Sequence, residues 1–365
     1  MTHCTPSAMC ITSRITRPFQ WNPPPHPMRL NPSPMPDAIT LESPFFIVGC
    51  GRSGTTLLRR MIDAHPLLAV PVESLFMIDY LRARDHITDV PYKRLILSEH
   101  EFSEWELSVS ESDLSNCRSV VEVINDLHER YAANEKAQFW GQKTPRFVRY
   151  GHLLKDVYPR AKFIHVIRDP RAVAISLRKS NVHRSNVYFG AQRWQKDVQA
   201  GLDLKRDFPN DVMEVSYETL VSETELTLRE ICDFLGIPFD EAMLSYHQQR
   251  EAAYEGYHAE IHKNLNAPPK QDRIEAWRKD LTPVEIALIE QVCSPLMGQL
   301  GYEPEQSDTP IPDNMVSQLK WERRTLGLYR QVRQYFRGRT RHLFYSIWRK
   351  YRLGLLGGDL SDVNY

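Results

Sequence analysis

A loop of small and hydroxyl-bearing residues near the start of the chain has the composition of a binding site for anionic oxygens. Four residues separate Gly49 from Gly54, and Thr55 and Thr56 follow directly. Glycines at this spacing let backbone N–H groups point at an anion, and the positive end of a following helix strengthens the attraction. The sequence therefore predicts that the segment from Gly49 to Thr56 binds a phosphate or a related oxyanion.

The residue after Gly54 distinguishes between classes of ligand. A nucleotide triphosphatase carries a lysine there, which reaches the β- and γ-phosphates, followed by a Ser or Thr that holds magnesium. In this chain the position is Thr55, while Arg52 supplies positive charge two residues before Gly54. The loop thus favours a donor that joins a phosphate to a sulfate over ATP. A P-loop kinase or NTPase is the alternative enzyme class, although no apolar strand evidently ends in a metal-binding Asp.

Short apolar runs alternate with helical patterns along the chain. The runs cover residues 45–48, 162–167 and 212–217, and each leads through a polar turn into a helical pattern. The helix after the third run ends at Gly236, and Thr282 begins another with Pro283 and a capping Glu285. Alternating strands and helices favour an α/β fold with a P-loop-like, doubly wound parallel sheet flanked by helices.

A second polar motif follows the run at residues 162–167. Arg168 and Ser176 lie eight residues apart, across a turn and two helical turns. This spacing aims a bidentate guanidinium and a hydroxyl at one phosphate group. The alternative is a local salt-bridge cluster formed by Arg168, Asp169 and Arg171, which is a common arrangement.

Three segments of the chain resemble the signatures of one enzyme family. They are Cys50–Arg59 with Asp63–Pro66, then Arg168–Ser176, and finally Trp277–Leu281 with a later Leu300-Gly301-Tyr302. The sequence resembles the sulfotransferases that use 3′-phosphoadenosine 5′-phosphosulfate (PAPS), in the branch of tyrosylprotein sulfotransferases and their bacterial relatives. The resemblance covers about residues 45–304. It implies direct in-line transfer of a sulfuryl group from PAPS to an acceptor hydroxyl or amine, with no metal.

The resemblance also implies a donor site built from both motifs. By position, the contacts to the 5′-phosphosulfate are Arg52, Ser53, Gly54, Thr55 and Thr56. Arg52 would also neutralise charge on the bridging oxygen as the sulfuryl group leaves. The contacts to the 3′-phosphate are Arg168 and Ser176. Tyr217 matches a donor-contacting tyrosine, with packing in the core as the alternative.

Two further groups of basic residues are assigned by the same resemblance. Lys143 falls where the family carries a lysine that stabilises the transferring sulfuryl oxygens. Arg273 and Arg278, with Lys263, Lys270 and Lys279, surround a loop that we expect to close over the donor.

Glu73 is the candidate general base, which an attacking alcohol needs in order to lose its proton. It lies 21 residues after Arg52, the spacing of the catalytic glutamate in the tyrosylprotein branch. Val72 precedes it where that branch has a second acid, which weakens the case for a peptidyl-tyrosine acceptor. A solvated surface glutamate is the ordinary alternative. His152 and His165 are the next candidates for the base, and His165 lies in an expected strand, where a core position is favoured.

Composition excludes several classes of partner and site. Lys plus Arg and Asp plus Glu both number 46, so the zero net charge gives no reason to expect nucleic acid as a partner. The six cysteines form no C-x-x-C pair, so no metal site is expected. No stretch approaches the roughly 20 apolar residues that cross a bilayer, and the start of the chain has no apolar signal region. We therefore expect a cytoplasmic protein.

The chain divides by composition into three parts. Residues 1–43 form a Pro-rich tail without material for a core, residues 44–305 the sulfotransferase domain, and residues 306–365 a basic amphipathic helical extension. Eleven cations and the single acid Glu322 lie between Lys320 and Arg352, with aromatic residues at spacings near three and four and a break expected near Gly338.

The function of the basic extension is open between two interpretations. In the first, residues 320–352 bind peripherally to an anionic membrane or to a polyanion. In the second, the extension packs on the domain and leaves a solvated cationic face. A non-catalytic binding module is the alternative to an enzyme, and the sequence leaves a homodimer open. The hydroxyl-bearing acceptor, whether glycan, peptide or small molecule, cannot be read from the donor motifs.

Overall fold

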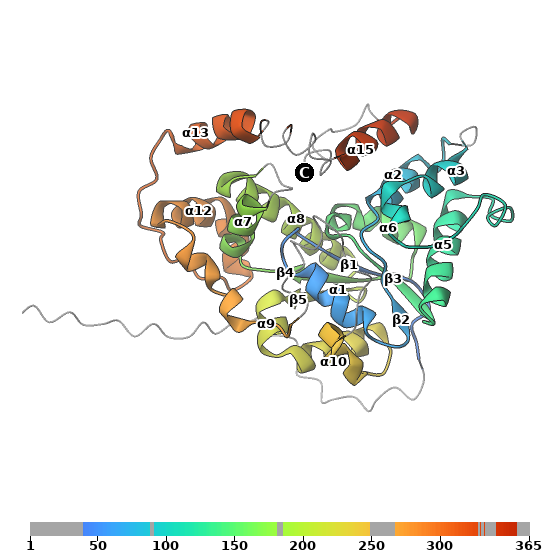
Figure 1. Ribbon diagram of the computed structural model, residues 1–365. Coiled ribbons are helices and arrows are strands. Elements are labelled where there is room, and N and C mark those ends of the chain that lie inside the picture. The colour runs from blue at the N-terminus through green and yellow to red at the C-terminus, as the bar shows by residue number, and fades with distance from the viewer. Residues whose placement is uncertain are drawn as a thin grey trace, which may run out of the picture.

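Five parallel strands form the centre of the molecule in a computed structural model that describes residues 39–87, 91–180, 185–248, 267–327, 329, 332 and 341–355. Their order is β2-β3-β1-β4-β5, and every neighbouring pair is parallel. Figure 1 shows helices on both sides of this sheet. The predicted doubly wound α/β fold is confirmed.

Three of the five strands lie at the predicted apolar runs, while β2 and β3 were not predicted. The strands are β1 (Phe45–Gly49), β2 (Leu68–Ala69), β3 (Phe139–Lys143), β4 (Lys162–Ile167) and β5 (Val212–Ser216). The α-helices are α1 (Thr55–Asp63), α2 (Leu75–Ala83), α3 (Tyr92–Leu97), α4 (His100–Ser103), α5 (Val120–Asn134), α6 (Gly151–Val157), α7 (Pro170–Lys179), α8 (Val187–Asp207), α9 (Tyr217–Ser222), α10 (Thr224–Leu235), α12 (Pro283–Gln299), α13 (Met315–Glu322) and α15 (Arg341–Arg352). Short 3₁₀ helices are η1 (Pro145–Tyr150), η2 (Glu241–Met243), η3 (Tyr246–Gln248), η4 (Gln271–Arg273) and η5 (Ala276–Lys279), and η6 (Arg323–Gly327) is a π-helix.

Strand β1 lies at the centre because both of its faces are apolar. Phe45 and Ile47 pack with α1, α9 and α10 on one side of the sheet, and Phe46 and Val48 pack on the other side. In Figure 1, α9 and α10 accordingly lie on the opposite side of the sheet from α8. A strand buried on both faces reads as a continuous apolar run rather than an alternation.

Local signals at helix ends are satisfied as the sequence predicts. Gly236 follows α10 in the left-handed conformation, at φ +79°. Thr282 and Glu285 form the predicted reciprocal capping box at the start of α12. The third predicted strand is one residue too long, since Ser216 already caps α9 and Tyr217 begins that helix.

The C-terminal helix α15 packs on α2, and a buried arginine joins them. Arg349 is 4% exposed. Its guanidinium donates to Asp79 at 2.9 Å, to Glu99 at 2.6 Å and to Glu101 at 3.4 Å. Lys350, also buried, lies 3.9 Å from Asp79. Two of the eleven cations in this segment are therefore buried in ion pairs and do not belong to a solvated face. The break expected near Gly338 lies outside the described residues.

We predict that Arg349→Met lowers the free energy of unfolding by about 3–5 kcal/mol, because it leaves buried carboxylates without their main counter-charge. Urea denaturation at neutral pH measures this change. The matched control is Arg352→Met on the same helix, where the arginine is exposed and the expected change is within about 0.5 kcal/mol. Equal unfolding midpoints for the two variants would show that the buried carboxylates do not depend on Arg349 as their counter-charge.

His165 lies in the core, as its place in a strand predicts. Its ring is fully buried in β4 and packs against Gly201 of α8, where a Cβ atom would come within 2.1 Å of it. Neither ring nitrogen has a hydrogen-bond partner in the described structure. Burial lowers the pKa of His165 to about 4, so the ring is neutral near pH 7. Enclosed in this way, His165 cannot receive a proton from an acceptor.

The depressed pKa of His165 predicts a loss of stability in acid. The unfolded chain binds a proton at His165 below pH ~6.5, whereas the folded chain binds one only near pH 4. Its contribution is therefore fully present above pH ~6.5 and is lost as the pH falls toward 4. We expect His165→Leu to reduce the slope of unfolding free energy against pH by up to about 1.4 kcal/mol per unit in this window. Urea midpoints at pH 4.5–7.5 measure it, and an unchanged slope would contradict the prediction.

Candidate functional site

The loop between β1 and α1 adopts the conformation that its glycines allow. Gly49 and Gly54 have φ values of +146° and +95°, and Arg52 between them has a φ of +76°, which is uncommon for a residue with a side chain. A Cβ atom at Gly54 would lie 2.3 Å from the Tyr217 ring, and one at Gly49 would lie 2.4 Å from the Val166 carbonyl oxygen. The glycines thus let the loop pack directly on β4 and the start of α9.

Ser53 marks the interior of this loop as a polar site. Its side chain is fully buried, and its hydroxyl has no hydrogen-bond partner among the described residues. No side chain caps the start of α1 at Gly54. A buried hydroxyl without a partner is costly, and an uncapped helix start attracts anions. Both features fit an oxyanion bound within the loop.

The two sequence motifs meet in space. Arg52 Nε donates to Ser176 Oγ at 3.0 Å across 124 residues of chain. The contact joins the loop after β1 to α7, which follows β4. The spacing of each motif alone could not show this, because it depends on β1 and β4 being neighbours in the sheet.

Arg168 is held beside the loop by carbonyl groups and an aromatic ring. Its guanidinium donates to the carbonyl oxygen of Arg52 at 3.3 Å and to that of Arg273 at 3.1 Å. It lies 4.0 Å from the centre of the Tyr217 ring. Its Nε is buried without a partner, and no acidic side chain of the described residues forms an ion pair with it. The arrangement leaves a positive charge available for an anion.

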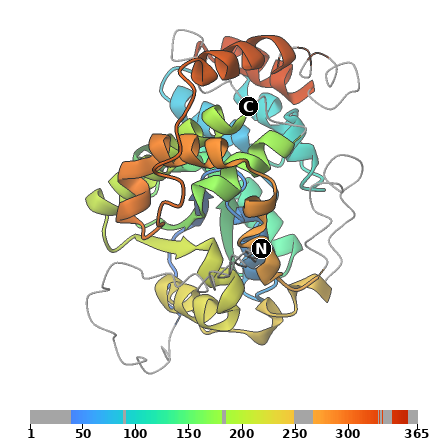
Figure 2. The same cartoon turned by 90° about the vertical axis from the view of Figure 1, so that its left-hand side faces the viewer.

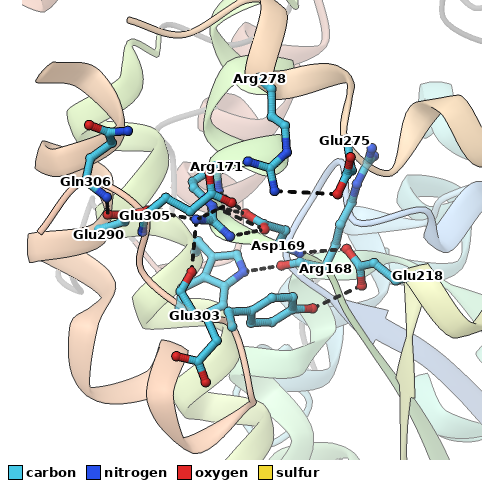
Figure 3. Close-up of polar contacts among 12 residues, drawn as sticks. Arg168, Asp169, Arg171, Glu218, Glu275, Arg278, Glu290, Glu303, Glu305 and Gln306 are labelled. Carbon is cyan, nitrogen blue, oxygen red and sulfur yellow. Dashed lines mark hydrogen bonds and ion pairs between the residues drawn. The ribbon is translucent and has the colours of Figure 1, made fainter. Parts of the chain in front are cut away.

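The polar residues next to Arg168 form a separate network, shown in Figure 3. Asp169 pairs with Arg171 at 2.7 Å, and Arg171 also pairs with Glu290 at 2.7 Å. Arg171 is buried over the ring of Trp277. The salt-bridge cluster considered from the sequence therefore exists for Asp169 and Arg171 but does not include Arg168.

This network fixes the backbone from which Arg168 projects. Trp194 donates from its indole N–H to the Arg168 carbonyl oxygen at 2.8 Å. Glu218 accepts from the Asp169 N–H at 3.0 Å and from the Tyr302 hydroxyl at 3.1 Å. Burial raises the pKa of Glu218. Tyr302 belongs to the third segment that resembles the family, and its hydrogen bond to Glu218 connects that segment to the backbone next to Arg168. The sequence analysis did not predict roles for Trp194 and Glu218.

Glu73 and Lys143 face each other next to the loop. Their side chains form an ion pair at 2.6 Å, and Lys143 Nζ also lies 3.4 Å from Thr56 Oγ1. Lys143 is buried at the end of β3, while the Glu73 side chain is 44% exposed. The Ser74 N–H donates to Thr144 Oγ1 at 3.1 Å and ties the two segments together. The structure thus places a carboxylate and an ammonium beside the oxyanion loop.

Not every predicted site residue joins this group. Arg278 pairs with Glu305 and lies 4.6 Å from the centre of the Trp277 ring, so its charge is used within the network of Figure 3. Arg273 contributes its carbonyl oxygen to Arg168. Lys263 lies outside the described residues. His152 is exposed and pairs with Asp207 at 2.8 Å.

The geometry therefore gathers most of the predicted residues at one place. They are Arg52, Ser53, Gly54, Thr55, Thr56, Glu73, Lys143, Arg168, Ser176 and Tyr217. In the described parts of the chain, no three His, Cys, Asp or Glu side chains are placed to hold a metal ion. That the reaction needs no metal stays a prediction.

Known proteins share both the sequence pattern and the fold. The family model for the sulfotransferase family matches residues 44–241, more than half of the chain. Protein-tyrosine sulfotransferase A of Caenorhabditis elegans is 27% identical over 298 residues, covering 77% of this chain and 73% of that protein. Protein-tyrosine sulfotransferase 1 of Danio rerio is 25% identical over 280 residues, covering 74% and 76%.

A solved structure supports the same fold. The sulfotransferase domain from the curacin biosynthetic pathway superimposes with a TM-score of 0.54 at 21% identity, covering 73% of this chain and 99% of that domain. The sequence match to the family, together with this shared fold, shows that the chain belongs to the sulfotransferase family.

Proposed function

We propose that this protein transfers a sulfuryl group from PAPS to a hydroxyl of its acceptor. The observation that carries the proposal is Arg168, a cation without a carboxylate partner among the described residues, next to a separate oxyanion loop. Two neighbouring anion sites suit a donor with phosphate groups at both its 3′ and 5′ positions. A triphosphate would instead need a lysine where this chain has the buried Thr55.

The residues present fit the donor. Ser53 offers a buried hydroxyl without a partner, and α1 offers an uncapped start. Arg52 joins this loop to Ser176, and Arg168 lies over Tyr217 on the same side. We assign the loop and Arg52 to the 5′-phosphosulfate, and Arg168 with Ser176 to the 3′-phosphate. PAPS would supply an activated sulfuryl group on a good leaving group.

Glu73 and Lys143 have different roles in the transfer step. Glu73 accepts the proton of the acceptor hydroxyl while that oxygen forms its bond to sulfur. The bond between sulfur and the bridging phosphate oxygen breaks, and its electron pair stays with 3′,5′-adenosine bisphosphate. Lys143 and Arg52 stabilise the charge that develops on the transferring and leaving oxygens. The 2.6 Å ion pair orients Glu73 before an acceptor arrives.

The solvent exposure of Glu73 indicates what size of acceptor can reach it. Its side chain is 44% exposed, so a hydroxyl carried on a large molecule can reach it. The similar C. elegans and D. rerio proteins are named protein-tyrosine sulfotransferases, which supports a protein or peptide as the acceptor. The tyrosylprotein branch has an acid where this chain has Val72. We therefore expect the peptide recognised by this protein to differ from the peptides that those enzymes recognise.

The first experiment compares nucleotides by calorimetry. We expect 3′,5′-adenosine bisphosphate to bind much more tightly than ATP with magnesium, because the chain offers two anion sites and no triphosphate lysine. Arg168→Ala should weaken that binding roughly 10- to 150-fold, the effect of losing about 1.5–3 kcal/mol from a charged hydrogen bond. The control Arg206→Ala removes an exposed arginine of α8 and should bind like the wild type. Equal or tighter binding of ATP would overturn the proposal.

The second experiment separates binding from chemistry. Glu73→Gln should bind the bisphosphate like the wild type but lose turnover by about two to four orders of magnitude, the usual contribution of a general base. Transfer of labelled sulfate from PAPS to a pool of peptides measures turnover. His152→Ala is the control and should keep normal turnover. The opposite pattern would assign the base to His152.

A further inference from the structure

Large exposed hydrophobic side chains are concentrated in the C-terminal segment. Of the nine that the described structure contains, only Ile39 and Leu226 lie elsewhere. The other seven are Trp321, Leu326, Tyr329, Val332, Ile347, Trp348 and Tyr351. Trp321 is 66% exposed. Single exposed hydrophobic residues are normal, but such a concentration indicates an interaction surface.

In helix α15, polar and charged side chains face the domain while aromatic side chains face outward. Among the side chains that the structure describes in α15, Ser346, Arg349 and Lys350 are buried, at spacings of three and four that place them on one helical face, and Leu353 just after the helix is buried too. Ile347, Trp348, Tyr351 and Arg352 lie on the exposed face. An ordinary surface helix turns its apolar face inward. Here charged groups are buried by pairing with α2, and the aromatic residues are left outside.

Two of the exposed aromatic residues pack on each other. The Trp348 and Tyr351 rings stack with centroids 5.8 Å apart and an interplanar angle of 25°. The Arg352 guanidinium lies 6.0 Å from the centre of the Trp348 ring. The outer face of α15 therefore combines stacked rings with a cation.

Helix α13 is anchored by its other face and presents a similar outer side. Leu319 packs against the core, and its carbonyl oxygen accepts from Asn186 at 2.8 Å. The Arg323 guanidinium lies 4.0 Å from the Phe189 ring. Trp321, between these anchors, stays exposed. Figures 1 and 2 both place α13 and α15 on the same side of the molecule.

The charges beside these rings select the kind of surface that they fit. Lys320, Arg324 and Arg352 are exposed among them, while Glu322 accepts from Asn186. An acidic polymer in water would engage the cations but leave the indole and phenol rings without an apolar partner. The interface of an anionic bilayer accommodates both, because Trp and Tyr rings enter the headgroup region and Lys and Arg meet anionic lipids.

We propose that the outer faces of α13, η6 and α15 form a docking surface for an anionic lipid bilayer. Binding is peripheral, and no helix of the described residues is long and apolar enough to span a membrane. Helix α15 packs on α2, which begins two residues after Glu73. The docking surface is therefore joined through α2 to the segment that carries Glu73. The proposal is independent of the identity of the sulfuryl donor.

Sedimentation of the full chain with lipid vesicles tests the proposal. We expect binding to vesicles of 70% phosphatidylcholine and 30% phosphatidylglycerol. The triple variant Trp321→Ala, Trp348→Ala, Tyr351→Ala should bind at least tenfold more weakly, with an unchanged unfolding midpoint because the three rings are exposed. Leu226→Ala is the matched control, since it removes an exposed hydrophobic residue of α10, and it should bind like the wild type.

A charge variant and two other ligand classes complete the test. Lys320→Gln, Arg324→Gln and Arg352→Gln should each reduce the preference for anionic over neutral vesicles roughly fivefold. No vesicle binding by the wild type, or equal binding by the triple variant, would overturn the proposal. Binding to heparin without binding to vesicles would also overturn it. So would a dimer in solution that the triple variant dissociates, because a second copy would then cover the aromatic residues.

Discussion

The register of β1 between β3 and β4 is the constraint on which the candidate site depends. Ile47 lies opposite Lys143 on one side, and Gly49 lies opposite Val166 on the other. Because all three strands are parallel, their carboxyl ends meet at one edge of the sheet. The oxyanion loop, Lys143 and Arg168 follow those ends directly. A shift of β1 by one residue would break these pairings and move the oxyanion loop out of line with Lys143 and Arg168.

Buried ion pairs then hold the loops that this edge carries. Arg171 with Asp169 and Glu290 supports the backbone at Arg168, and Arg349 with Asp79 and Glu99 supports the helix that follows Glu73. Such pairs cost desolvation and add little net stability. Their effect is to specify one arrangement of the surrounding chain. The net charge of the protein is zero, but the charges are unevenly distributed along the chain, with eleven cations and one acid between Lys320 and Arg352.

Local patterns made the fold class, three of the five strands and part of the site predictable. The loop after β1, the strands at residues 45–48 and 162–167, and the caps at Gly236 and Thr282 all follow from short-range rules about glycine, apolar runs and capping. Glu73 and Lys143 were found through family resemblance, and the structure places them together. Trp194, Glu218 and the acids around Arg349 were not predicted, because each acts through a partner far away in sequence. No local pattern encodes such a partner.

The Arg349 ion pairs also affect how the chain is made. Asp79 and Arg349 are 270 residues apart, so at translation rates of about 5–20 residues per second roughly 14–54 s pass between their syntheses. During that interval Asp79 and Glu99 lack the Arg349 counter-charge. The packing around α2, and with it the setting of Glu73, is therefore completed only when α15 has been synthesised. A ribosome-bound chain that already contains both sequence motifs still lacks the helix that packs on α2.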